Sequence, residues 1–177
     1  MWTRERLQSF VHQRLDGVRL ICVANREPYI HVRGAAGIQV MEPASGVVTA
    51  LDPVMQAAGG VWVAHGSGSA DAETVDARGR VWVPPKDPKY MLRRVWLSQK
   101  EEQGYYYGFA NEALWPLCHI AYHRPVFRES DWREYVAVNE KFASAIIDEA
   151  TDAERAIVFI QDYHLALVPK LVKQRLP

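Results

Sequence analysis

The sequence contains few cysteines, no excess of one charge and no long apolar run. Its 177 residues include only two cysteines, Cys22 and Cys118, and no CxxC pair, so no disulfide framework is indicated. Lys and Arg total 21, and Asp and Glu also total 21, which gives no reason to expect nucleic acid or an anionic membrane as a partner. No apolar stretch reaches transmembrane length, and the first residues lack the apolar core of a signal peptide. We therefore expect a protein of the reducing cytoplasm.

Common catalytic signatures are also missing. The sequence has no G-x-S-x-G elbow, no Walker P-loop, no G-x-G-x-x-G fingerprint and no paired-carboxylate signature. The six histidines do not follow a zinc-ligand spacing, and no acid accompanies the one close pair, His119 and His123. We expect no metal and no cofactor. The missing fingerprints also argue against a nucleotide-binding α/β module with unrelated chemistry.

Apolar runs alternate with amphipathic segments along the chain. The runs predict strands at residues 18–24, 61–64, 80–83, 94–97 and 157–160. Helical periodicity predicts helices at 47–58, 132–150 and 165–174, and a partly helical aromatic region at 101–119. Two short runs, 29–32 and 38–41, flank a glycine turn and predict a hairpin. This order indicates one α/β domain over residues 1–177, with a leading helix within residues 1–17 and a doubly wound parallel sheet.

Polar residues directly follow the apolar run Ile157–Ile160. Four apolar residues predict a strand buried on both faces. Asp162, Tyr163 and His164 then come at its carboxyl end, where open α/β sheets bind ligands. Asp162 could accept hydrogen bonds from sugar hydroxyls or cap the following helix. His164 could act as an acid or base, or serve as a turn residue.

Two further strand ends carry polar residues, Asn25-Arg26 and His65-Gly66-Ser67. Parallel strands bring such ends to one edge of a sheet. Arg26 offers a guanidinium fork for phosphate or carboxylate, or is an ordinary surface arginine. Ser45-Gly46 precedes a predicted helix and offers free backbone N–H groups to a phosphate, or is a simple N-cap. The residues therefore indicate an edge that binds phosphate and hydroxyl groups.

Aromatic residues gather in the segments Tyr105–Asn111 and Leu114-Trp115-Pro116. Most such clusters belong to a core. Others form a platform for sugars, because an aromatic face packs on sugar C–H groups while a hydroxyl or indole N–H gives direction. Composition leaves both interpretations open.

Taken in order, short motifs of this chain resemble the amino-terminal domain of the trehalose-6-phosphate synthases, glycosyltransferase family 20. The matching pieces run from about residue 18 to the end: Ala24-Asn25-Arg26, Ser45-Gly46-Val47, Ala58 to Trp62, Tyr106 to Asn111, Leu114-Trp115-Pro116 with His119, Tyr135 with Val138-Asn139, and Asp162 to Leu165. Each piece alone is weak, but seven in the family's order with similar gaps make a specific match.

The resemblance implies the amino-terminal half of a GT-B glycosyltransferase with two Rossmann-like domains. It implies retaining transfer of glucose from UDP-glucose, or another nucleotide-glucose, to glucose 6-phosphate without a metal. By motif, Arg26 and Tyr106 would hold the acceptor phosphate, and Trp115 would wall the acceptor pocket. Asp162 would be the catalytic-site residue on the acceptor hydroxyls, with His164 beside it as a substrate-binding residue. Ser45-Gly46 would approach the donor diphosphate.

Three places differ from the family pattern. Ser45-Gly46 stands for a glycine pair, and Gln161 stands for the histidine before Asp-Tyr-His. Ala64-His65-Gly66-Ser67 stands for Gly-Trp-Ser-Gly. Because the lost tryptophan belongs to the acceptor side, another phosphorylated polyol or cyclitol stays open as the acceptor.

Two functional hypotheses remain after this comparison. The chain is either the acceptor domain of a trehalose-6-phosphate synthase-type enzyme or a non-catalytic module that binds sugar phosphates. We expect the carboxyl-terminal donor-binding domain to be absent from these residues. The chain alone would then be inactive, and a nucleotide-sugar donor would be a partner only together with that domain. An apolar edge exposed by its absence would favour a homo-oligomer.

Overall fold

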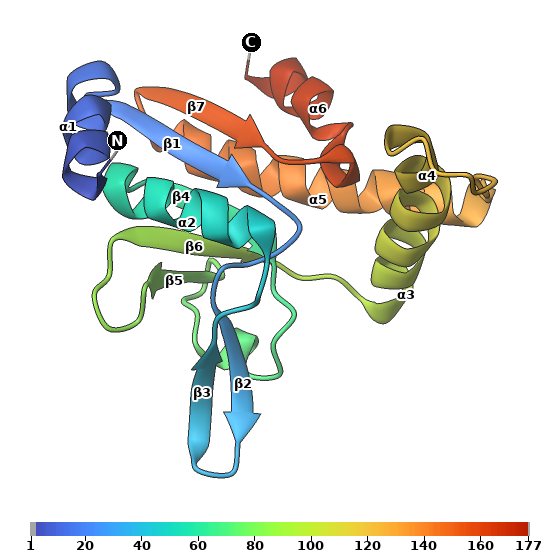
Figure 1. Ribbon diagram of the computed structural model, residues 1–177, viewed down its shortest axis with the longest axis horizontal. Coiled ribbons are helices and arrows are strands. Elements are labelled where there is room, and N and C mark those ends of the chain that lie inside the picture. Colours follow the sequence, from blue (N-terminus) through green and yellow to red (C-terminus); the bar gives the residue numbers. More distant parts are fainter. Residues whose placement is uncertain (1–2, 177) are drawn as a thin grey trace.

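The computed structural model describes residues 3–176, which form a five-stranded sheet between helices (Figure 1). The strands are β1 (Val18–Val23), β4 (Val61–His65), β5 (Arg80–Val83), β6 (Tyr90–Val95) and β7 (Arg155–Ile160). Their order across the sheet is β5-β6-β4-β1-β7. The last four are parallel neighbours, and β5 pairs antiparallel with β6. The α/β class is confirmed, and the sheet is mixed rather than wholly parallel.

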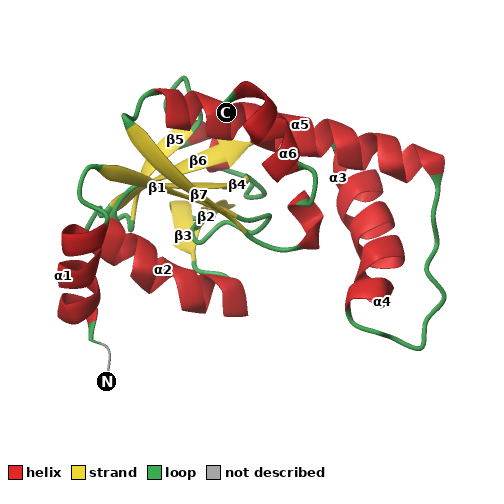
Figure 2. Ribbon diagram, turned by 90° about the horizontal axis from the view of Figure 1, so that it is seen from above, coloured by secondary structure: helices red, strands yellow, loops and turns green. Residues whose placement is uncertain are grey.

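Helices cover the two faces of the sheet (Figure 2). They are α1 (Arg4–Arg14), α2 (Gly46–Ala58), α3 (Gln99–Glu102), α4 (Trp115–Cys118), α5 (Glu129–Thr151) and α6 (Val168–Arg175). A π-helix, η2 (Gln103–Leu114), joins α3 to α4, and short 3₁₀ turns form η1 (Asp71–Glu73) and η3 (Tyr163–Leu165). The predicted leading helix is α1; Met1 and Trp2, which that prediction included, lie outside the described residues.

The central strands are apolar at successive positions because both of their faces are buried. Ile21 and Val23 of β1 pack into the cluster beneath α5, whereas Cys22 and Ala24 pack into the cluster beneath α2. Because successive side chains point to opposite faces, a strand covered on both faces needs apolar residues at every position. Burial raises the pKa of the Cys22 thiol to about 12, so Cys22 is the buried free thiol that the sequence predicts.

The prediction for residues 157–160 is wrong in one respect. β7 is a strand, but it lies at the edge of the sheet and pairs with β1 alone among the described strands. Ile157 and Phe159 are 43% and 46% exposed. They pair in register with Leu20 and Cys22 of β1, which pack into the cluster beneath α2, so the cover on that face does not extend to β7. The apolar composition of residues 157–160 indicates that the strand can be buried. It does not indicate which helix or strand would cover each face.

The predicted strand at residues 94–97 is displaced. β6 begins at Tyr90 and ends at Val95, so Trp96 and Leu97 follow it. Two adjacent arginines, Arg93 and Arg94, belong to β6. They lie inside the strand because buried carboxylates neutralise them.

The predicted hairpin is confirmed. β2 (Ile30–Gly34) and β3 (Gly37–Met41) form a separate antiparallel ribbon that projects from the sheet (Figure 1). Gly37 has a φ of 113°, which glycine adopts at little cost. The chain then enters α2, which ends where Gly59 takes a φ of 70°.

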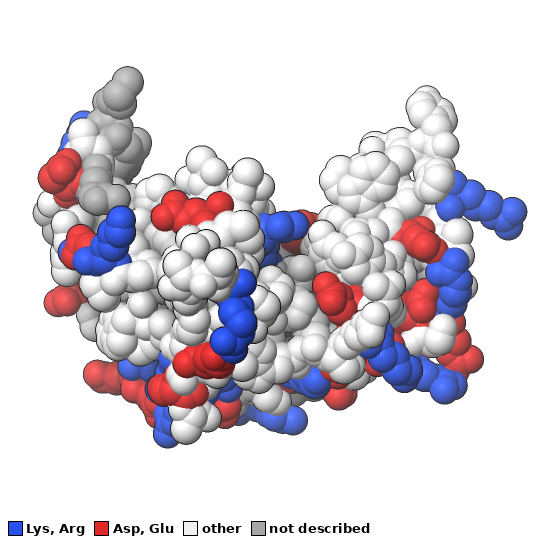
Figure 3. Space-filling view, turned by 90° about the horizontal axis from the view of Figure 1, so that it is seen from below, with Lys and Arg blue, Asp and Glu red and all other residues white. Residues whose placement is uncertain are grey.

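No helix within residues 3–176 is long and apolar enough to cross a membrane. In the same range, no three His, Cys, Asp or Glu side chains are grouped so that they could hold a metal ion. Positive and negative side chains are intermixed over the face seen in Figure 3.

Candidate functional site

Three parallel strand ends meet at the carboxyl edge of the sheet. The backbone N–H of Gln161, after β7, donates to the Val23 carbonyl of β1 over 2.8 Å. His65, at the end of β4, donates its backbone N–H to the Asn25 carbonyl over 3.2 Å. These bonds hold the segments after β4, β1 and β7 side by side, as the sequence predicts.

A row of stacked rings lies over the end of β7. His164 stacks on Tyr106 of η2 at a centroid distance of 5.2 Å and on Tyr163 at 4.4 Å. Tyr163 meets His119 edge-on at 6.0 Å, and His119 stacks on Trp115 at 4.9 Å. The structure therefore brings together His164, Tyr106 and Trp115, which are far apart in the sequence.

Two glycines let η2 pack closely against α5. A Cβ on Gly104 would lie 2.7 Å from Glu134 Cγ, and a Cβ on Gly108 would lie 2.5 Å from Asp131 Oδ2. Both positions therefore require glycine if η2 is to rest directly on α5. π-Helical segments are frequent at functional sites, and here the close contact leaves Tyr105 buried and Tyr106 facing His164.

Asp162 adopts a backbone conformation that is almost exclusive to glycine, with φ 74° and ψ 163°. Its carboxylate accepts a hydrogen bond from the Tyr163 N–H over 2.7 Å. A second oxygen lies 3.4 Å from His164 Nδ1. The capping role that the sequence left open is therefore present, and the carboxylate remains half exposed at the sheet edge.

Burial and the nearby positive charge of Arg26 lower the pKa of His164, whereas the charge of Asp162 opposes that shift. His164 is thus neutral at pH 7. Its Nδ1 faces Asp162, and its buried Nε2 has no hydrogen-bond partner among the described residues. These contacts assign the proton to Nδ1 and leave Nε2 as a buried acceptor without a partner among the described residues. Arg26 is exposed beside it.

Several contributors to the site were not assigned a role from the sequence. The buried hydroxyl of Tyr105 donates to Asn25 Oδ1 over 3.0 Å and ties η2 to the end of β1. Asn139 of α5 donates to the His164 carbonyl over 3.1 Å and accepts from the Leu167 N–H over 3.2 Å. Asn139 belongs to one of the matched motifs, so the sequence indicated the residue but not its structural role. The aromatic segment is therefore core at Tyr105 and faces the site at Tyr106.

Ser45 and Gly46 lie at the amino end of α2. This helix leads from the carboxyl edge of β1 to the start of β4, so its first turn is at the same edge as Arg26 (Figure 1). The Ser45 side chain makes no capping hydrogen bond, which contradicts the simple N-cap interpretation. The N–H groups of that first turn are available to an anion. No ring or side-chain contact among the described residues joins Ser45 or Gly46 to the aromatic row, so their donor-phosphate role stays a prediction.

His65, which stands at the position of the family's tryptophan, ends β4 as a buried residue. Burial lowers its pKa, and the charges of Glu102 and Asp71 oppose the shift. A neutral imidazole at this edge can donate and accept one hydrogen bond each, which a tryptophan cannot do.

Comparisons with known proteins identify the family of this chain. The family model of glycosyltransferase family 20 matches residues 18–177. A trehalose-6-phosphate synthase of Mycolicibacterium vanbaalenii is 36% identical over 171 residues, which are 96% of this chain and 34% of that protein. The chain thus spans about a third of the length of this relative.

Solved structures share the fold. A structure from E. coli, named for trehalose-6-phosphate and bound with UDP-2-fluoro glucose, has a TM-score of 0.60 and 25% identity over 89% of this chain and 30% of its own. An α,α-trehalose-phosphate synthase from Burkholderia xenovorans in complex with glucose-6-phosphate has a TM-score of 0.63, with 20% identity over 89% of this chain and 31% of its own. The second likeness concerns the fold alone. By its family match, this chain belongs to glycosyltransferase family 20 and corresponds to the amino-terminal part of its trehalose-6-phosphate synthases.

Proposed function

We propose that this chain is the acceptor-binding part of a retaining glycosyltransferase of the trehalose-6-phosphate synthase type. In the complete enzyme, glucose would pass from a nucleotide-glucose to glucose 6-phosphate. The observation that carries the proposal is the meeting of Arg26, Asp162 and the ring row at one sheet edge. These groups supply a cation for a phosphate, a carboxylate for hydroxyls and aromatic faces for a sugar ring.

Each side chain has a distinct role in this proposal. The Arg26 guanidinium binds the acceptor phosphate through charge-assisted hydrogen bonds, and the Tyr106 hydroxyl adds a donor. Asp162 accepts hydrogen bonds from acceptor hydroxyls, and the ring of His164, stacked on Tyr106, lines the site beside it. Trp115 closes the far end of the ring row. The relative from Burkholderia xenovorans is in complex with glucose-6-phosphate, which supports this choice of acceptor.

Catalysis would rest on positioning rather than on a covalent group of this chain. Holding the acceptor hydroxyl near the anomeric carbon removes much of the entropic barrier. The first turn of α2, at Ser45 and Gly46, would stabilise the leaving diphosphate with backbone N–H groups and the helix dipole. The E. coli relative is bound with UDP-2-fluoro glucose, which supports a nucleotide-sugar as the donor.

The acceptor site is tested by titrating the chain with glucose 6-phosphate. We expect weak binding, because an open half-site leaves the ligand hydrated. Arg26→Ala should weaken it about tenfold or more, since a hydrogen bond to a charged group contributes about 1.5–3 kcal/mol. Asp162→Asn should weaken it through the hydroxyl contacts. Arg78→Ala is the matched control, because this exposed arginine pairs with Asp152, which lies between α5 and β7. Unchanged binding in both site variants would sink the assignment.

A second acceptor is supported by His65. A phosphorylated polyol or cyclitol would offer a hydroxyl where the family's tryptophan presents an apolar ring. Parallel titrations with glucose 6-phosphate and an inositol phosphate separate the two acceptors. His65→Trp should shift the preference toward glucose 6-phosphate if His65 contacts the ligand.

The non-catalytic alternative has its own assay. The chain is incubated with UDP-glucose and glucose 6-phosphate, and UDP release is measured. We expect acceptor binding without UDP release by this chain alone. Release that begins when a donor-binding domain of a relative is added would favour the enzyme over the non-catalytic module.

A further inference from the structure

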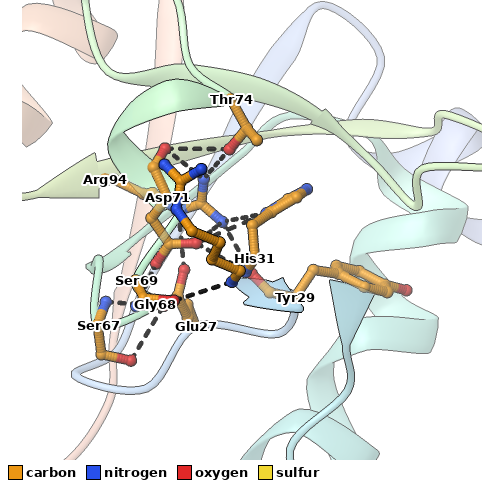
Figure 4. Close-up of polar contacts among 10 residues, drawn as sticks. Glu27, Tyr29, His31, Ser67, Gly68, Ser69, Asp71, Thr74 and Arg94 are labelled. Atoms are coloured by element: carbon orange, nitrogen blue, oxygen red, sulfur yellow. Dashed lines mark hydrogen bonds and ion pairs between the residues drawn. The ribbon is translucent and has the colours of Figure 1, made fainter. Parts of the chain in front are cut away.

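A fully buried arginine, Arg94, lies against Glu27, the residue that follows Arg26 (Figure 4). Arg94 of β6 is 0% exposed, and its Nε donates to Glu27 Oε2 over 2.8 Å. Its Nη2 pairs with Asp71 Oδ1 at 2.8 Å and lies 2.8 Å from His31 Nδ1. Its Nη1 donates to Thr74 Oγ1 over 3.0 Å. Every nitrogen of the guanidinium therefore has a partner, and the partners come from the loop after β1, the β2–β3 hairpin and the segment Asp71–Thr74.

The carboxylates around Arg94 extend these contacts to the backbone. Glu27 Oε1 accepts from the Ser67 N–H over 2.9 Å. Asp71 Oδ1 accepts from the His31 N–H over 2.7 Å, and Asp71 Oδ2 accepts from the Gly68 N–H over 2.6 Å. The network therefore ties the loop after β1, the loop after β4 and the base of the β2–β3 hairpin to one point of β6.

The loop after β4 packs tightly against the start of the β2–β3 hairpin. A Cβ on Gly68 would lie 2.3 Å from the His31 carbonyl oxygen. The Ala70 N–H donates to that same oxygen over 3.0 Å. Arg94 Nη2 also donates to the Tyr29 carbonyl over 3.0 Å. The backbone from Glu27 to His31 is thus fixed on both sides, in a segment that contains no regular structure before Ile30.

Arg26 directly precedes this fixed segment. On its other side, Asn25 is held by the Tyr105 hydroxyl and by the His65 N–H. Arg26 itself is exposed. Because the residues on both sides of it are anchored, the network fixes the place from which its side chain extends. A backbone that is already in place loses less conformational entropy when a ligand binds.

We propose that Arg94, through Glu27 and Asp71, is a positioning residue that holds the backbone of Arg26 in place for binding of the acceptor phosphate. The inference rests on the proposed function, because it assumes that Arg26 contacts that phosphate. A lysine cannot replace Arg94 in this role, since one ammonium cannot reach acceptors spread around a planar fork.

The test compares Arg94→Lys with the wild type in titrations with glucose 6-phosphate and with glucose. We expect Arg94→Lys to weaken glucose 6-phosphate binding about tenfold and to leave glucose binding unchanged, because only the phosphate meets Arg26. The double variant Arg26→Ala/Arg94→Lys should bind no more weakly than Arg26→Ala alone. Glu27→Gln, which keeps the shape of the side chain, should show a smaller loss of the same kind if Arg94→Lys unfolds.

The matched control is Arg80→Lys. The Arg80 side chain donates to the buried carboxylate of Glu149 over 2.8 Å and lies near Asp152, whereas its contacts with Asp76 are made by its backbone and are kept in the variant. Its replacement should lower the melting temperature and leave both affinities unchanged. Wild-type affinity in folded Arg94→Lys, equal losses for both ligands, or additive losses in the double variant would overturn the inference. Unchanged affinity in Arg26→Ala would instead overturn the proposed function.

Discussion

Asp162 carries backbone strain at the point where the candidate site needs a carboxylate. A residue in this region of φ and ψ costs about 1–3 kcal/mol, which glycine avoids. We expect Asp162→Gly to be more stable than Asp162→Ala by about that amount, because both lose the carboxylate and only alanine retains the strain. Chemical denaturation of both variants measures the difference. Equal stabilities would show that the conformation is not strained.

Glu27 makes stability depend on pH. Burial, together with the nearby Asp71 carboxyl, raises the pKa of Glu27 to about 7, although the Ser67 N–H and Arg94 act in the opposite direction. Between pH 4.5 and about 7 the unfolded chain loses this proton while the folded chain keeps it. The Glu27 contribution to stability is therefore present at low pH and lost as pH rises through about 7.

Unfolding of the wild type and Glu27→Gln at pH 5 and pH 7.5 tests this sign. We expect the stability of Glu27→Gln relative to the wild type to increase with pH. His31 and Asp71 adjoin the same arginine, so the difference between the two proteins, rather than either curve alone, is the quantity to compare. Glu140→Gln, at an exposed position of α5, should leave the wild-type slope unchanged.

At the scale of elements, α5 fixes the turn that follows β7. The buried Asn139 side chain joins the Tyr135 and His164 carbonyls and the Leu167 N–H. We expect Asn139→Ala to lower the free energy of unfolding by about 3 kcal/mol, because buried groups left unsatisfied cost about 1–3 kcal/mol each. Thermal unfolding measures the change. Ser144→Ala, at an exposed position of the same helix, should change it by less than about 0.5 kcal/mol.

The elements that the sequence predicts correctly are those with a local signal. β1 and β4 are continuous apolar runs, and α2 and α5 show helical periodicity. The strand predicted at 94–97 missed residues 90–93 of β6, because Arg93 looks like a surface residue until its buried partner Glu149 is known. The π-helical winding of η2 has no period of its own in the sequence, because its geometry depends on contact between Gly104 and Gly108 and α5.

At the scale of the molecule, β7 leaves an apolar edge open. The exposed Ile157 and Phe159 lie on a strand whose outer edge is unpaired within residues 3–176, a combination that promotes association. We expect the chain to self-associate and Phe159→Lys to reduce that association. Sedimentation velocity over a concentration series measures both. Trp82→Lys, on the opposite edge strand β5, is the control; a wild type that remains monomeric throughout would contradict the expectation.

The sequence by itself determined the fold class, the family and the residues most suited to a phosphate and a sugar, because apolar periodicity and short motifs are local properties. The tertiary structure decided which of those residues meet. It placed His164 against Tyr106, gave Asp162 its strained conformation and put Arg94 against Glu27. It also turned β7 from an expected central strand into an exposed edge. These features depend on contacts between segments that are distant in the sequence. A local sequence pattern does not indicate which residues such contacts bury or which charges they pair.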